Sequence, residues 1–161
     1  MFDKPNHVAI LCSLHYGGYT MKLIERMLRS IKQRNGNVIL RAEVSKLGSA
    51  SQVTEALKTL QETGVIVRIG TGVYAKTRKS SVTGATIPAG SLETLASEAL
   101  KKMGVEVSAG QAAVSYNAGR TTQLPGAFVA NTGNRRISRK IAVGGRSVKY
   151  ENNFSRTEAI A

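Results

Sequence analysis

The sequence contains few of the residues that support metal, redox or acid–base chemistry. It has one cysteine, two histidines and ten acidic residues among 161. A single cysteine excludes a disulfide within the chain and a zinc site built from several cysteines, and it is typical of a reducing compartment. Cys12 lies near His7 and His15, but their spacing matches no zinc-binding pattern. We therefore expect no metal and no cofactor.

Catalytic motifs are absent as well. No close pair of carboxylates stands out for acid–base work, and nothing beside Ser115 or Tyr116 would activate either as a nucleophile. Gly70 and Gly72 lack the rest of a dinucleotide fingerprint, and the pair at 144–145 belongs to no phosphate-binding loop. No apolar run approaches the roughly 18–20 residues of a membrane span. We expect a cytoplasmic protein that is not an enzyme.

Basic residues, in contrast, are abundant. The net charge is +13 and the pI is about 10.3. Residues 1–90 carry 13 Lys and Arg against 5 Asp and Glu, and residues 91–161 carry 10 against 5, so both halves are basic. Such a balance indicates a polyanionic partner, most often nucleic acid, although a basic surface without that role is the alternative.

One stretch, from Val38 to Arg78, gives the charge a structural context. An apolar run and a short helix lead to Gly48, and a longer helix is expected over Ser49–Thr63, with Ser49 and Gln52 as its capping box. Two β-rich runs follow in 65–76, joined around Gly70 and Gly72. Helix, turn, helix and hairpin is the order of a winged helix, in which Ser49–Thr63 is the recognition helix and Val65–Lys76 the wing.

The exposed positions of these two elements predict the DNA contacts. Polar residues off the apolar stripe of the recognition helix would read bases, and cations of the wing would meet phosphates or a minor groove. The predicted DNA-binding residues are Ser51, Gln52, Thr54, Lys58, Arg68, Thr71, Lys76 and Arg78. Lys76, Arg78 and Lys79 have a simpler alternative, which is to keep a linker soluble.

The remaining segments complete a fold of class α+β. Residues 1–20 are interpreted as an N-terminal extension that need not belong to the fold, and 21–76 as the winged-helix domain, whose first helix is capped by Thr20 and ends near Arg34. Residues 77–90 are rich in small residues and are predicted to be a linker. Residues 91–152 form a small α+β domain, and 153–161 a frayed tail.

The second domain is expected to begin with a helix capped by Ser91, followed by short strands at 105–107 and 127–131 and a short helix over 109–117. Segments 135–143 and 146–151 are predicted to pair as a hairpin around 144–145. Its cations are a possible partner surface or second DNA surface: Arg135, Arg136, Arg139, Lys140, Arg146 and Lys149. A dimerising or stabilising role is the structural alternative, and each half is expected to bury its own core.

Several runs together carry a resemblance to a known family. They are LRAEVSKLGSASQVTEALKTLQETGVIVRIGTGVYAKTR, PAGSLETLASEALKKMGVEV, YNAGRTTQLP, FVANTG and RRISRKI. Over residues 21–153 the chain resembles the AbiE-type abortive-infection antitoxins in their short form. The resemblance implies a bacterial transcriptional repressor of its own operon, with a winged helix on promoter DNA. It also implies a C-terminal domain that counters a nucleotidyltransferase-like toxin.

Three functions are compatible with these features. The first is a DNA-binding repressor that acts as the antitoxin of a type IV system. The second is a stand-alone winged-helix transcription factor without a toxin. The third is an RNA-binding protein, which the charge favours and the low aromatic content of 5% disfavours.

Overall fold

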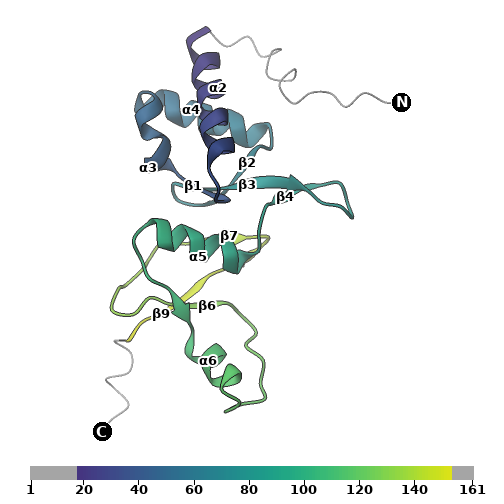
Figure 1. Ribbon diagram of the computed structural model, residues 1–161, viewed down its shortest axis with the longest axis vertical. Helices are drawn as coiled ribbons and strands as arrows, with labels where there is room; N and C mark the ends of the chain where they lie inside the picture. Colours follow the sequence, from purple (N-terminus) through teal and green to yellow (C-terminus); the bar gives the residue numbers. More distant parts are fainter. Residues whose placement is uncertain (1–17, 154–161) are drawn as a thin grey trace.

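The computed structural model describes residues 18–153 of the chain, and it confirms a mixed α+β fold. Helices α2 and α4 lie above a small antiparallel sheet, α5 lies below it, and α6 lies at the far end of the molecule (Figure 1). Predictions on His7, Cys12 and His15, on most of the N-terminal extension and on all but the first residue of the tail fall outside the described residues.

Helix α2 covers Gly18–Gln33. It begins before Thr20, so Thr20 lies within the helix and the predicted capping role is wrong. The apolar stripe forms as its spacing requires, because residues three and four apart share one face of a helix. The stripe residues Leu23, Ile24, Met27 and Ile31 are all buried.

Two short elements lead into the longer helix. Strand β1 is Val38–Leu40, helix α3 is Arg41–Val44, and the 3₁₀ turn η1 is Ser45–Leu47. Helix α4 then runs over Ala50–Glu62.

Both ends of α4 follow the predicted chemistry. The Gln52 amide N–H donates to Ser49 Oγ at 3.4 Å, and the Gln52 side-chain oxygen accepts from the Ser49 amide at 3.1 Å. At the other end Gly64 adopts a φ of 69°, and Val65 N donates to Leu60 O at 3.0 Å. This closure satisfies the last carbonyls of the helix.

The central sheet follows directly. Strand β2 is Ile66–Gly70 and strand β3 is Val73–Lys79, and both pair antiparallel, with β3 between β1 and β2. Of the two glycines expected to allow the turn, Gly72 has the positive φ of 69° and Gly70 does not. Gly70 is needed for a different reason, because a Cβ there would lie 2.8 Å from the carbonyl oxygen of Lys140.

The segment predicted as a linker is instead part of this sheet. Strand β3 continues to Lys79, and strand β4, Thr86–Pro88, pairs antiparallel with its last three residues. The two strands form a hairpin that projects to one side of the molecule (Figure 1). Sequence reasoning missed β4 because small residues and Pro88 indicate a loop, whereas a single edge pairing tolerates proline.

The second half begins as predicted and then diverges. Helix α5 is Leu92–Lys102, with Ser91 Oγ accepting from Thr94 N at 3.2 Å, and helix α6 is Gln111–Asn117. The strand expected at 105–107 is absent, and β5 is Ser108–Ala109. It pairs antiparallel with β6, Val129–Asn131.

The hairpin predicted for residues 135–151 forms around 144–145, but it is much shorter than predicted. Strands β7, Ala142–Val143, and β8, Arg146–Ser147, make only a short pair around the glycine turn. The chain then leaves this pair, and β9, Lys149–Glu151, joins β6 in parallel. Val148 N donates to Ile141 O at 3.0 Å, and Tyr150 lies opposite Ala130 of β6.

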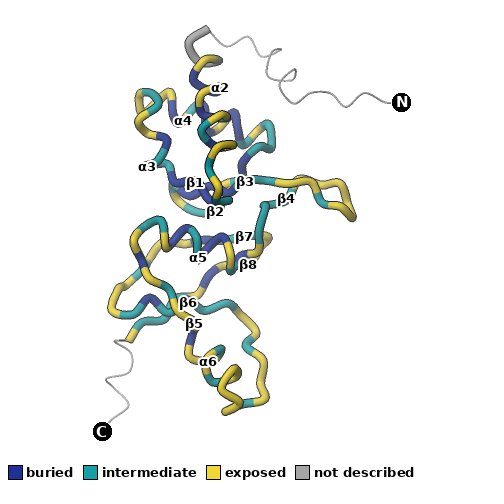
Figure 2. The backbone as a smooth tube through the Cα atoms, in the orientation of Figure 1, coloured by how far each residue is buried: buried dark blue, intermediate teal, exposed yellow. Residues whose placement is uncertain are grey.

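Two apolar cores lie on opposite faces of the central sheet (Figure 2). The upper core joins α2, α4 and residues such as Ile39 and Tyr74. The lower core combines Val38 and Val73 of the sheet with α5 residues, and with Ala130, Ile141 and Val148. Because this core takes residues from both halves of the sequence, the second half does not bury a core of its own, contrary to expectation.

Polar contacts reinforce this junction. The Glu98 carboxylate on α5 accepts hydrogen bonds from Asn37 N at 3.1 Å and Val38 N at 3.0 Å. Lys102, one turn later, donates to the Val38 carbonyl and lies 3.5 Å from Glu43 Oε1. These contacts satisfy backbone groups on the outer edge of β1, which would otherwise be open to another strand.

Candidate nucleic-acid interface

The exposed side of α4 carries the predicted base-reading residues. Ser51, Thr54 and Lys58 are exposed, and their spacing of three and four residues puts them on one face of the helix. Lys58 Nζ lies 3.9 Å from Glu62, and both side chains are more than 60% exposed, so the pair contributes little and leaves Lys58 free to turn. Gln52 is also exposed, but its side-chain oxygen is engaged in the capping box.

Arg41 is a residue of this surface that the sequence interpretation missed. Its Nη2 donates to Thr54 Oγ1 at 2.8 Å and to Ala50 O at 3.2 Å, both in the first turn of α4. Its backbone N donates to Gly72 O at 2.9 Å in the β2–β3 turn. One sequence signal could have indicated Arg41. It directly follows the apolar run Val38–Leu40, at the point where the chain passes from the core to the surface.

The β2–β3 turn therefore lies beside the first turn of α4. Thr71, at its tip, is exposed, and its carbonyl accepts from Arg139 Nη1 at 3.1 Å. Arg68 is exposed on β2, and its Nε donates to Gly70 O at 3.2 Å. Arg41, Arg68 and Arg139 thus bring three guanidinium groups to the region of this turn. We call the set Arg41, Ser51, Thr54, Lys58, Arg68, Thr71 and Arg139 the α4–turn surface.

Two predicted contacts do not belong to this surface. Lys76 Nζ donates to the Arg34 carbonyl at 2.5 Å in a partly buried position, so its charge stabilises the end of α2. Arg78 is exposed but lies on the far part of β3, opposite Ile87 of β4. Since β3 runs away from the turn, Arg78 is separated from Thr71 by most of the strand.

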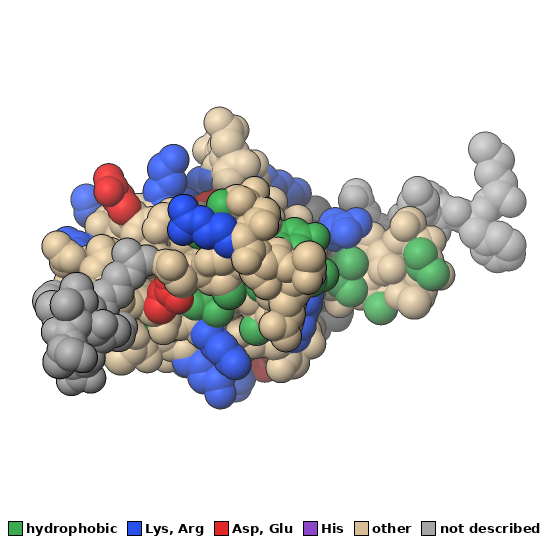
Figure 3. Space-filling view, turned by 90° about the horizontal axis from the view of Figure 1, so that it is seen from below, with side chains coloured by type: hydrophobic (Ala, Val, Ile, Leu, Met, Phe, Trp, Pro, Cys, Tyr) green, Lys and Arg blue, Asp and Glu red, His purple; other side chains and the backbone are tan. Residues whose placement is uncertain are grey.

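The cations of the predicted second surface are likewise dispersed (Figure 3). Arg135 Nη1 donates to Gly104 O at 2.8 Å, whereas Arg139 reaches Thr71. Lys140 follows Arg139, and its carbonyl lies against Gly70. The other three cations have different surroundings. Arg136 has an interaction partner of its own, Arg146 lies near Glu93, and Lys149 is exposed on β9. The segment therefore adds only Arg139 and Lys140 to the region of the turn.

A match to a known protein family shows to which family the chain belongs. The sequence matches the family of unknown function DUF6088 over residues 23–160. The chain belongs to this family. The match includes α4, the β2–β3 turn and the whole second half, so the α4–turn surface lies within the family's common region. No curated protein matches the sequence.

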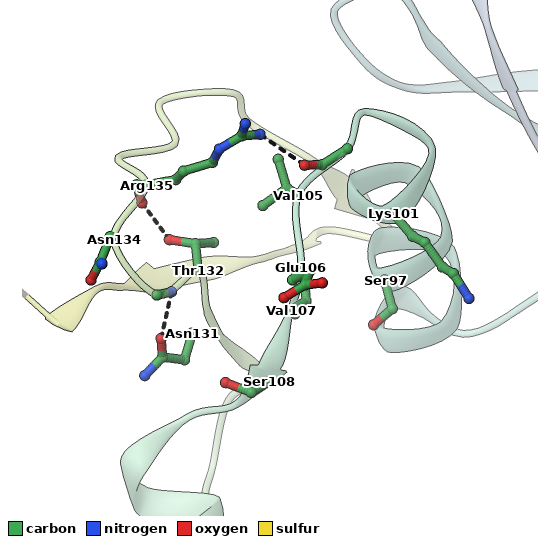
Figure 4. Close-up of a pocket in the computed structure, with 12 residues that line it drawn as sticks. Ser97, Lys101, Val105, Glu106, Val107, Ser108, Asn131, Thr132, Asn134 and Arg135 are labelled. Carbon is green, nitrogen blue, oxygen red and sulfur yellow. Dashed lines mark hydrogen bonds between the residues drawn. The ribbon is translucent and has the colours of Figure 1, made fainter.

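This DUF6088 member also has an open hollow, drawn in Figure 4, whose lining residues include none of the α4–turn surface. Its volume is about 1000 Å³, and it lies between α5 residues such as Lys101, the segment 104–108 and the loop 131–135. Thr132 Oγ1 donates to Arg135 O at 2.6 Å, and Gly133 N donates to Asn131 Oδ1 at 2.8 Å, so the loop holds its own shape. Glu106 is the one carboxylate among the lining residues.

The described residues contain no cluster of three or more metal-ligating side chains. Among the described residues, the pKa values of two groups are shifted, and neighbouring groups explain both shifts. Glu93 lies in the first turn of α5. A hydrogen bond from its own backbone N–H, and then one from the Ser91 side chain, lower the pKa of its carboxyl group. Burial raises the pKa of Tyr150, whose hydroxyl donates to Arg139 O at 2.8 Å. Within 18–153, no helix has the length and apolar character needed to cross a bilayer.

Proposed function

We propose that this chain binds duplex DNA through the α4–turn surface, with α4 as the recognition helix of a winged helix and the β2–β3 turn as its short wing. The observation that carries the proposal is the position of Arg41. Its contacts join the start of α3, the first turn of α4 and the β2–β3 turn. These are the parts that a winged helix presents together to a groove and its flanking phosphates.

The side chains at this surface suit the two kinds of contact that DNA offers. Ser51 and Thr54 are short hydrogen-bonding residues near the N-terminal end of α4, where a recognition helix meets base edges. The cations Arg41, Lys58 and Arg68 match phosphates on either side. Glu62 is the last residue of the same helix, and its carboxylate favours approach of the N-terminal half over the C-terminal end.

The net charge supports a nucleic-acid partner, and the folded surface favours duplex DNA over RNA. Among the described tyrosines, Tyr74 is buried, Tyr150 is partly buried and Tyr116 is exposed on α6, and α4 carries no aromatic side chain on which a base could stack. An RNA-binding protein with this charge would need such stacking positions for sequence recognition.

Selection from a random pool provides the experiment. The full chain is incubated with random duplex DNA and, in parallel, with random single-stranded RNA at one salt concentration. We expect enrichment of a short duplex motif, and loss of the enrichment in the double variant Lys58→Ala, Arg68→Ala with an unchanged melting temperature. Enrichment from the RNA pool alone, or an unchanged motif in the double variant, would contradict the proposal.

The narrower role of repressor and antitoxin rests on the resemblance to AbiE-type proteins. Its test is expression with any neighbouring nucleotidyltransferase-like gene beside a promoter reporter. Loss of repression in the Lys58→Ala, Arg68→Ala variant with toxin neutralisation intact is the expected result. Charge reversal at Arg135 should do the opposite, and it is a cleaner choice than Arg139, which touches Thr71. A stand-alone transcription factor would repress without neutralising any toxin.

A further inference from the structure

Helix α6 is anchored at its base and is otherwise only partly covered by the rest of the described residues. The excursion between β5 and β6 is closed where Gly110 N donates to Val129 O at 3.2 Å and Gln111 N donates to Glu151 Oε1 at 2.7 Å. Beyond this base, no residue of α6 is buried. The helix stands at the far end of the molecule from α2 and α4, and its tube is drawn mainly as exposed (Figure 2).

Large apolar side chains are exposed on this excursion. Among the described residues, four large hydrophobic side chains are classed as exposed, and three lie here: Val114 at 47%, Tyr116 at 39% and Leu124 at 69%. A seven-residue helix is well below the roughly 12–15 residues at which an isolated helix becomes marginally stable in water. A helix of this length with no buried residue is stabilised when its exposed apolar side chains are covered.

The distribution of charge indicates what covers it. From Val107 to Asn134, Arg120 is the sole charged residue, whereas 20% of the whole chain is charged. A nucleic acid would require cations on this surface, and an acidic protein would be better matched to the basic surfaces elsewhere. In a chain of net charge +13, a second copy meets least repulsion where the surface carries almost no charge.

We infer that α6 and the following loop, residues 111–127, form the surface through which two copies of this chain associate. An isologous contact places the same surface, with its exposed apolar side chains and its single charged residue Arg120, on both copies, as a two-fold dimer requires. Seen from this end, apolar side chains lie among uncharged ones, and Lys and Arg side chains lie both within this face and around it (Figure 3). Association here leaves both α4–turn surfaces exposed, because α4 lies at the opposite end and the β2–β3 turn lies at the central sheet, away from α6 (Figure 1). The inference concerns oligomeric state and does not depend on DNA binding.

Light scattering after size exclusion tests the inference on the full chain. We expect the wild type to be a dimer, and the double variant Val114→Asp, Leu124→Asp to be a monomer with unchanged circular dichroism. The matched control is Val82→Asp, which places the same charge at a 91% exposed valine on the β3–β4 hairpin and should leave the dimer intact. A monomeric wild type, a double variant that remains dimeric, or an equal effect of Val82→Asp would each overturn the inference.

A cross-linking experiment covers the case in which the double variant does not fold. Cys12 is the sole cysteine, so Cys12→Ser gives a background without thiols. In that background Leu124→Cys should form a disulfide-linked dimer under mild oxidation, and Val82→Cys should not. Absence of cross-linking at Leu124→Cys, or equal cross-linking at both positions, would refute the proposed surface.

Discussion

Substitution of Glu98 is the sharpest test of how the two halves of the chain are joined. Its carboxylate accepts from two backbone N–H groups of the β1 edge, Asn37 N and Val38 N, and its side chain is 24% exposed. Glu98→Ala leaves both donors unpaired at a site where water has only partial access. It also removes one of the two carboxylates near Lys102.

The expected cost follows from these contacts. A hydrogen bond to a charged group contributes about 1.5–3 kcal/mol, so two contribute about 3–6 kcal/mol before any compensation. Partial access of water to the site reduces this, and we expect a loss of about 2–4 kcal/mol in the free energy of unfolding. For a chain of this size that corresponds to a fall in Tm of roughly 5–15 °C.

Urea unfolding followed by circular dichroism measures the effect. Glu98→Gln keeps the size of the side chain and one acceptor oxygen. Its loss in the free energy of unfolding should therefore be about half that of Glu98→Ala. Glu106→Ala, at an exposed glutamate just after α5, is the control and should change stability by no more than about 0.5 kcal/mol. A Glu98→Ala loss no larger than the control, or two separate unfolding transitions in the wild type, would refute the account of one joined fold.

Other expectations concern single elements. Ser49→Ala removes the α4 cap and should cost about 1 kcal/mol, whereas the neighbouring control Ser51→Ala should be nearly neutral by the same urea assay. Leu57→Ala, at a residue 1% exposed, should cost about 2–5 kcal/mol, and a loss below 1 kcal/mol would contradict the packing of α4 on the sheet. Burial raises the pKa of Tyr150, so its contribution to stability is complete below the ordinary tyrosine pKa of about 10 and is lost as pH rises through the folded value. Tyr150→Phe should therefore flatten the alkaline fall in stability, and an unchanged slope of stability against pH would contradict this.

Local chemistry explains which parts of the fold the sequence predicts. The capping box of Ser49 and Gln52 and the glycine endings at Gly64 and Gly104 involve residues a few positions apart, and the structure contains all of them. The same holds for the buried stripes of α2, α4 and α5, whose period is fixed by helix geometry.

Contacts between distant residues explain the errors. The pairing of β9 with β6 joins segments about twenty residues apart, and an adjacent hairpin was the simpler interpretation of the same apolar pattern. Lys76 has the composition of a phosphate contact, but its ammonium group bonds to a carbonyl 42 residues earlier. Arg41 was missed for the converse reason, because its importance comes from the first turn of α4 and the β2–β3 turn meeting beside it.

The salt dependence of duplex binding tests the central claim most directly. Affinity for the selected duplex is measured by fluorescence anisotropy over a series of salt concentrations. Variants compared with the wild type are Arg41→Ala with Lys58→Ala, and the control Lys22→Ala with Arg26→Ala, two exposed cations of α2. Each phosphate contact contributes about −0.9 to the log–log slope, so the first pair should weaken binding and reduce the slope by up to about 1.8. The control should leave slope and affinity nearly unchanged. An equal loss of affinity in both double variants, or an unaltered log–log slope in the Arg41→Ala, Lys58→Ala variant, would contradict the assignment of the α4–turn surface.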